Sequence, residues 1–175
     1  GFRPDHVLTG RLSLPLKTYP SGAAILAFHE RLMEEVGHQR GITAVAVSNN
    51  VPISGNSGKS AVKVIGHVLQ PGESLRGHYC YDVLGAYFQA LGISLMEGRF
   101  IETADSHRAE RVCVVDEDFA RAYWPRGNAL GQRLYRSSQE EDPSQAFTVV
   151  GIVGAVKQKA LTENQAQGAV YFPYV

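Results

Sequence analysis

The first 47 residues combine two different hydrophobic periods, and this combination limits the possible folds more than any other feature of the sequence. Apolar and polar side chains alternate over residues 7–14, which predicts a half-buried strand. Apolar residues then recur at helical spacing over residues 25–36, and Ser21 is placed to cap that helix. A β-branched run at residues 42–47 is typical of a second strand. We therefore expect a strand–helix–strand unit at this end of the chain.

The remaining residues contain more strand-like than helix-like segments. A helix is expected after Asp116, whose side chain can cap it, and a shorter helix is expected at residues 86–91. Further strands are expected at residues 61–68, 78–83, 111–115, 134–136, 147–156 and 169–174. Strand–helix–strand units mixed with neighbouring strands favour the α+β class, arranged as two lobes.

The composition excludes several classes of protein. Lys and Arg total 17 and Asp and Glu total 17, so the chain lacks the basic character of a nucleic-acid or anionic-membrane binder. The longest apolar run, at residues 147–156, is too short to span a bilayer. We find no secretory signal peptide, and because residue 1 is Gly instead of Met we expect a piece of a longer protein.

Metal and disulfide chemistry have little support in the sequence. The two cysteines, Cys80 and Cys113, are too few for a disulfide scaffold or a thiolate zinc site, and whether they pair stays open. The six histidines lack the spacing of a zinc-peptidase helix. His67 and His78 become neighbours if their strands pair, and two surface side chains are then expected more than a metal pair. We predict no metal and no cofactor.

Two catalytic motifs are incomplete. Residues 54–60 resemble a phosphate-binding loop, but the first Gly is missing because position 53 is Ile, and the following residues predict a strand instead of a helix. Ser60 and Lys63 match an acyl-enzyme spacing, yet on a strand they point to opposite faces. The acidic residues 116–118 are explained by helix capping. The residues thus predict a protein that is not an enzyme.

Short landmarks are spread in order over nearly the whole chain, and each is unspecific by itself. They lie at residues 1–9, 19–20, 27–28, 32, 41–46, 51–55, 87–93, 98–100, 112–117, 120–125, 130–134, 148–154 and 170–174. As an ordered set, they resemble the MacB-like periplasmic core domain of ABC-transporter permeases, in the FtsX-like and MacB-like permease family.

The resemblance implies a porter-like lobe, which we place at residues 5–92 plus 165–175, and an inserted α/β lobe of the Sabre type at residues 93–160. It implies a location on the periplasmic, extracytoplasmic face of the bacterial inner membrane. It also implies a non-catalytic role, in which the transmembrane helices of the permease carry the conformational change driven by a cytoplasmic ATPase. A periplasmic adaptor or lipoprotein is a further possible partner, and the isolated domain is expected to be a monomer.

Exposed loops are the expected place for such contacts, because rigid elements commonly present binding residues on loops. The loops at residues 49–59 and 137–145 are our candidates. Their polar side chains give the predicted partner-binding residues Asn49, Asn50, Asn56, Ser57, Lys59, Glu140 and Glu141.

An alternative is a free-standing extracytoplasmic protein that binds a small molecule. It would require a pocket with aromatic walls and a few convergent polar groups. A cleft between the lobes, near Tyr87, Trp124 and Tyr171, is the expected location of such a pocket.

Overall fold

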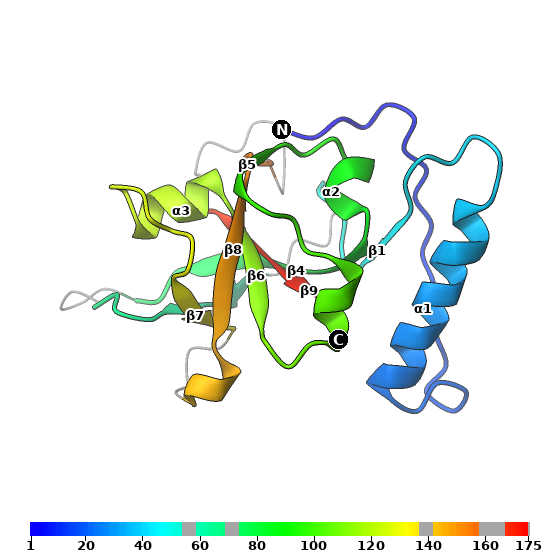
Figure 1. Cartoon of the computed structure of the whole chain (residues 1–175), viewed down its shortest axis with the longest axis horizontal. Helices are drawn as coiled ribbons and strands as arrows, with labels where there is room; N and C mark the ends of the chain where they lie inside the picture. Colours follow the sequence, from blue (N-terminus) through cyan, green and yellow to red (C-terminus); the bar gives the residue numbers. More distant parts are fainter. Residues whose placement is uncertain (54–58, 69–73, 137–141, 158–166, 175) are drawn as a thin grey trace.

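The computed structural model describes residues 1–53, 59–68, 74–136, 142–157 and 167–174 (Figure 1). Within them the fold is α+β, as expected from the sequence, with one sheet of nine strands. The helices are α1 (Gly22–Gly37), α2 (Tyr87–Ala90) and α3 (Glu117–Tyr123), with 3₁₀ turns η1 (Thr103–His107) and η2 (Pro143–Gln145). The strands are β1 (Ala46–Ser48), β2 (Lys59–Ala61), β3 (Lys63–Val64), β4 (Gly77–Gly85), β5 (Leu95–Gly98), β6 (Val112–Asp116), β7 (Arg133–Tyr135), β8 (Phe147–Val153) and β9 (Ala169–Pro173).

The last strand, β9, lies in the interior of the sheet. It pairs in parallel with β4 and antiparallel with β6, and the main path is β1-β4-β9-β6-β8-β7-β3. The short strand β2 pairs with β4, whereas β3 pairs with β7 near the far end of that path. Only Val62, which is fully buried, separates β2 from β3. The sheet is therefore curled, because one short stretch of chain connects its two ends.

The two faces of the sheet carry separate hydrophobic clusters. Along β9, Ala169 and Tyr171 belong to one cluster, whereas Val170 and Phe172 belong to the other, as the alternation of side chains on a strand requires. The first cluster is completed by residues of β4 and α2, including Tyr81. The second cluster is completed by Phe119 of α3 and by residues of β6, β7 and β8. All five β9 residues are buried, because this strand is covered on both faces. Its sequence is therefore continuously apolar and does not alternate.

The capping residues expected from the sequence are confirmed. The Ser21 hydroxyl accepts a hydrogen bond from the Ala24 N–H at 3.2 Å, and α1 begins at the next residue. The Asp116 carboxylate accepts from the Phe119 N–H at 2.8 Å and starts α3 directly after β6. These caps are local interactions, so sequence spacing alone was sufficient to locate them.

The strand expected at residues 7–14 is wrong, since the structure shows this segment as irregular chain (blue in Figure 1). The side chain of Leu8 is 96% exposed and that of Leu12 is 54% exposed. A strand needs a neighbouring backbone to pair with, and no described strand pairs with this segment.

Two other boundaries differ from expectation. The second strand of the N-terminal unit, β1, covers only residues 46–48 instead of 42–47, and the strand expected at 61–68 is replaced by the short β2 and β3. Strands from both predicted lobes, residues 5–92 and 93–160, belong to the same sheet, where β9 joins β4 to β6. The two-lobe division at residue 92 stays a prediction.

Candidate functional site

Asp82 on β4 brings together the beginnings of the two loops predicted to bind partners. Asn49 donates its side-chain N–H to Asp82 Oδ2 at 2.9 Å, and its amide oxygen accepts from the Asp82 backbone N–H at 3.1 Å. Arg136 donates to both carboxylate oxygens, at 2.9 Å for its Nη2. Because Arg136 directly precedes residues 137–145, one carboxylate fixes where both loops leave the sheet. We call Asn49, Asp82 and Arg136 the Asp82 cluster.

Asp82 is half-buried, whereas Asn49 and Arg136 are exposed, and Arg136 lies beside the aromatic core. The Arg136 guanidinium carbon lies 4.8 Å from the centre of the Phe172 ring, a cation–π arrangement. Burial alone would lower the pKa of Arg136, but the hydrogen bonds and negative charge of Asp82 outweigh it and the pKa is raised. Burial, aided by the charge of Asp82, also raises the pKa of Tyr174. The Arg136 guanidinium therefore stays charged and is held beside Asp82, directly before the loop at residues 137–145.

The other predicted partner-binding residues do not join this cluster. The carbonyl oxygen of Asn50 accepts from the Ser48 hydroxyl at 2.6 Å, which shapes the start of its loop. Lys59 lies 5.2 Å over the Tyr79 ring, and Tyr79 and Asp82 are three residues apart on a strand and so point to opposite faces. Four predicted residues lie outside the described part of the chain: Asn56, Ser57, Glu140 and Glu141.

Sequence analysis missed Asp82 and Arg136. A lone carboxylate inside the apolar strand at residues 78–83 was the signal that could have identified Asp82, because a charge on a half-buried strand generally has a partner. Nothing in the sequence spacing indicated that Arg136, 54 positions later, is that partner.

A second polar group is centred on His78, which is buried at 2% exposure. Its Nδ1 contacts the Gln167 carbonyl oxygen, which can only accept, so Nδ1 carries the proton. Its Nε2 lies 2.7 Å from the Tyr123 hydroxyl and accepts from it in the neutral ring. Burial lowers the pKa of His78, and the positive charges of Arg76 and Lys59 lower it further. The imidazole is therefore a neutral structural link.

His67 and His78, which were expected to be neighbours, share a neighbour in Tyr123. The His67 ring lies 5.0 Å from the Tyr123 ring, so both histidines contact the same tyrosine. Among the residues that the structure describes, no three His, Cys, Asp or Glu side chains are grouped as a metal site. Cys80 and Cys113 are both free thiols, and burial raises the pKa of Cys80 to about 11.

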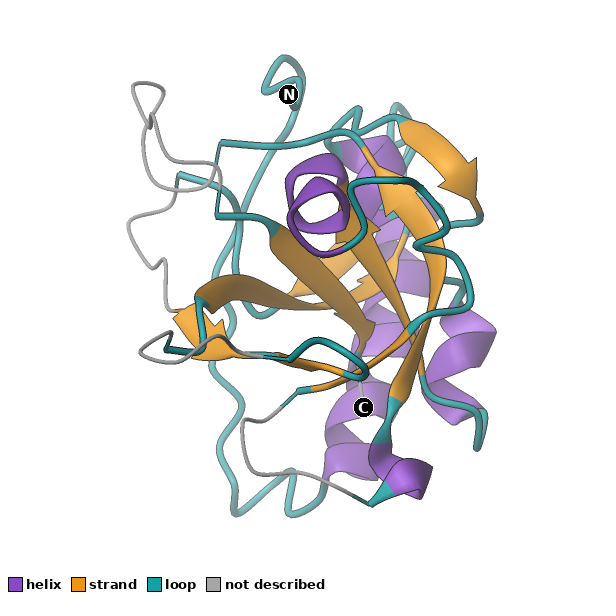
Figure 2. Cartoon of the chain, turned by 90° about the vertical axis from the view of Figure 1, so that its left-hand side faces the viewer, coloured by secondary structure: helices purple, strands orange, loops and turns teal. Residues whose placement is uncertain are grey.

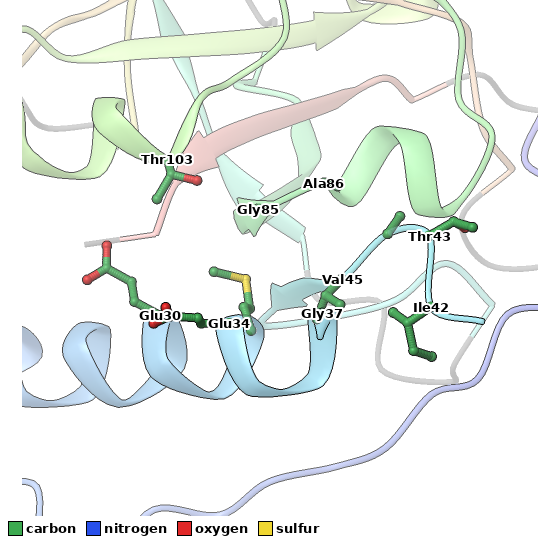
Figure 3. Close-up of a pocket in the computed structure, with 11 residues that line it drawn as sticks. Glu30, Glu34, Gly37, Ile42, Thr43, Val45, Gly85, Ala86 and Thr103 are labelled. Carbon is green, nitrogen blue, oxygen red and sulfur yellow. The ribbon is translucent and has the colours of Figure 1, made fainter. Parts of the chain in front are cut away.

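A shallow groove of about 450 Å³ separates α1 from β1, the end of β4 and η1 (Figure 3). Glu30 and Glu34 line it on the helix side, and Ile42 and Val45 line it on the other. At one end of the groove, Glu30 accepts from His107 of η1 at 2.6 Å. The groove therefore combines two carboxylates from α1 with a mostly apolar lining that includes Met33.

The three aromatic residues expected to line an inter-lobe pocket do not converge. Tyr87 and Tyr171 are buried together in the first hydrophobic cluster, with ring centres 6.0 Å apart. Trp124 packs against the second cluster, on the other face of the sheet. They contribute to the core instead of a common binding site.

The polar groups above include an ion-pair cluster, helix caps and one buried neutral histidine, and they lie in an α+β domain with exposed loops and a shallow groove. In the described residues, no helix is both long and apolar enough to cross a bilayer.

Comparison with known proteins assigns the family. The sequence profile of the MacB-like periplasmic core domain matches residues 11–175. The chain belongs to this family, and it is an extracytoplasmic domain of an ABC-transporter permease of the MacB type. The family is that of a transporter domain and not a catalytic one. A search of curated protein sequences found no match.

Solved structures share the fold. The periplasmic region of MacB from Actinobacillus actinomycetemcomitans is 20% identical, with a TM-score of 0.56 over 83% of this chain and 55% of that one. The extracellular domain of the ABC-type transporter YknZ from Gram-positive bacteria is 14% identical, with a TM-score of 0.50 over 84% of this chain and 63% of that one. This chain therefore spans less than two thirds of the length of either structure.

Proposed function

We propose that this domain works without catalysis, by transmitting the ATP-driven movement of its permease and by contacting substrate or periplasmic partners during export. The energy comes from a cytoplasmic ATPase and reaches the domain through the transmembrane helices of the permease. The partners are the rest of the permease and, outside the membrane, an adaptor or lipoprotein. Family membership over residues 11–175 favours this function over that of a free-standing small-molecule binder.

The observation that carries the contact role is the convergence of Asn49 and Arg136 on Asp82. Asn49 and Arg136, each at the beginning of one predicted loop, are far apart in the sequence but are anchored by the same carboxylate, which supports a common role for the two loops. Because β4 pairs with β9 in the interior of the sheet, movement of the sheet carries this position with it. We propose that residues 49–59 and 137–145 form one partner-binding surface.

Replacement of residues 50–58, or of residues 137–145, by a Gly-Ser sequence of equal length tests this role in the full permease with its ATPase. The anchor Asn49 and the β2 residue Lys59 are left in place. We expect normal expression and ATP hydrolysis but severalfold lower transport. The control is a Gly-Ser replacement of residues 126–128, a shorter exposed loop after α3. Unchanged transport after both loop replacements would remove this surface from the proposal.

We also propose that the porter-like lobe, residues 5–92 plus 165–175, moves relative to the Sabre-like residues 93–160 during the transport cycle. Spin labels at Gln89 and Ala122, both exposed, report the distance between the two parts in the full permease. We expect the distance distribution to shift when ATP is added. An identical distribution with and without ATP would show that the two parts move as one body.

A further inference from the structure

The two free cysteines lie on strands that flank β9 on either side (Figure 1). Cys80 of β4 pairs with Val170 of β9. On the other edge of β9, the same Val170 pairs with Val115, which is two residues after Cys113 on β6. All four side chains lie on the face of the second hydrophobic cluster, within the curled sheet that Figure 2 shows from a second direction. The two thiols thus share a face of the sheet and are separated by β9.

This separation is too large for a disulfide. Neighbouring strands are about 4.8 Å apart, so β4 and β6 are about 10 Å apart with β9 between them. The Cα atoms of a disulfide lie within about 7 Å of each other. In the folded domain Cys80 and Cys113 therefore stay apart, although Cys113 belongs to the second cluster and Cys80 packs against it.

Removal of β9 would change this geometry. Because β9 is parallel to β4 and antiparallel to β6, β4 and β6 are antiparallel to each other. If their two free edges paired, opposite residues would have Cα atoms about 4.5–5.5 Å apart, which is within the range of a disulfide. A shift of two residues would place Cys80 opposite Cys113 and keep every side chain on its own face.

An extracytoplasmic domain is exposed to disulfide oxidants, because disulfides form and persist in such compartments. In the reaction both cysteines lose their S–H protons, one S–S bond forms between them, and the oxidant takes up two electrons and leaves as two thiols. In the folded domain the thiols resist this reaction. Cys113 is fully buried, and burial raises the pKa of both thiols, to about 11 for Cys80.

We infer that β9 controls disulfide formation in this domain. Cys80 and Cys113 stay thiols while β9 lies between them, and a disulfide oxidant links them once β9 has left the sheet. The linked cysteines then hold β4 against β6, so that β9 cannot return until the disulfide is reduced. The inference depends on the strand order and on the extracytoplasmic location, and not on the proposed transmission of ATP-driven movement.

A substitution that displaces β9 tests the inference in the full permease, with any cysteine outside residues 1–175 replaced by Ser. Val170→Asp places a carboxylate in the buried centre of β9, and the matched control Leu26→Asp places one on the buried side of α1. Oxidised glutathione is the oxidant, and mass spectrometry after quenching with N-ethylmaleimide measures the Cys80–Cys113 disulfide. We expect it to form at least tenfold faster in Val170→Asp than in the unaltered or the Leu26→Asp protein. Equal rates in all three proteins would overturn the inference.

A second measurement leaves β9 unaltered. The permease is oxidised by glutathione in a urea series, and we expect the disulfide only at urea concentrations that unfold the domain. After removal of urea, the amides of residues 169–172 should exchange hydrogen at least tenfold faster in the oxidised protein than in the same protein treated with dithiothreitol. Disulfide formation at the same rate without urea would overturn the inference, as would equal protection of these amides with and without the disulfide.

Discussion

Arg136 donates to both carboxylate oxygens of Asp82 while its guanidinium carbon lies 4.8 Å from the centre of the Phe172 ring. The planar guanidinium can bind a carboxylate with two parallel hydrogen bonds and stack on an aromatic ring at the same time, which a lysine cannot do. Residue 136, although it is exposed, is therefore part of the link between β4 and the core.

Arg136→Ala is expected to lower the free energy of unfolding by about 1–2 kcal/mol, because it removes two charge-assisted hydrogen bonds from a partly buried carboxylate. Urea unfolding measures the change. The matched control is Arg121→Ala, which removes the exposed ion pair with Asp118 and should cost less than about 0.5 kcal/mol. Equal effects of the two substitutions would mean that the Asp82 cluster is an ordinary surface ion pair.

Asp116 should make the domain less stable as the pH rises from about 4 to about 7. Burial raises the pKa of Asp116 to about 7. The backbone hydrogen bonds from Phe119 and Ala169 oppose this rise, whereas the negative charges of Asp118 and Glu117 add to it. In this pH range the folded state holds a proton that the unfolded state has lost, so stability falls as pH rises. Asp116→Asn keeps the cap without the charge, and should flatten this part of the profile. Thermal unfolding between pH 4 and 7 measures both proteins, and parallel profiles would contradict the assignment.

His78 is expected to act in the opposite direction. Because burial lowers its pKa below 6.5, the unfolded state binds a proton that the folded state does not, and stability falls as the pH drops below 6.5. His78→Gln retains a polar side chain without this titration, and so should reduce the loss of stability at acidic pH. The double variant with Asp116→Asn separates the two contributions in the same unfolding assay. A profile that His78→Gln leaves unchanged would show that the imidazole titrates normally.

Gly168 is expected to tolerate no side chain. Its φ is +68°, and an added Cβ would lie 2.7 Å from the Phe119 backbone nitrogen. Gly168→Ala should therefore lower the free energy of unfolding by at least about 2 kcal/mol, through backbone strain and collision with the start of α3. Gly127→Ala is the control, since Gly127 also has a positive φ, +86°, but an open surrounding. Chemical denaturation measures the free energy of unfolding of both variants. Equal losses would mean that the positive φ alone, and not the collision with α3, causes the destabilisation.

The sequence predicted those parts of the fold that depend on local interactions. Ser21 and Asp116 were identified as caps because a cap bonds to the N–H groups two or three residues ahead. Residues 7–14 were predicted as a strand from alternation alone, which shows which side chains can share a face but not whether a neighbouring strand exists.

The partner-binding role of the two loops stays a prediction. Both loops were selected from their composition, whereas the common anchor of Asn49 and Arg136 depends on the position of Asp82 on β4 and on the curl of the sheet that brings β7 near it. These are long-range relationships. The same reason explains why Tyr87, Trp124 and Tyr171 were expected together at a cleft between lobes, although they lie in two different clusters.

The interior position of β9 sets the order in which the chain can fold. Tyr79 on β4 pairs with Ala169, 90 positions later, and Val115 on β6 pairs with Val170. During synthesis, β4 and β6 leave the ribosome long before the strand that joins them, so each has an unpaired edge until residue 173 has emerged. We therefore expect slow folding, limited by closure of this long loop, and a nascent chain that needs protection by chaperones while it is exported.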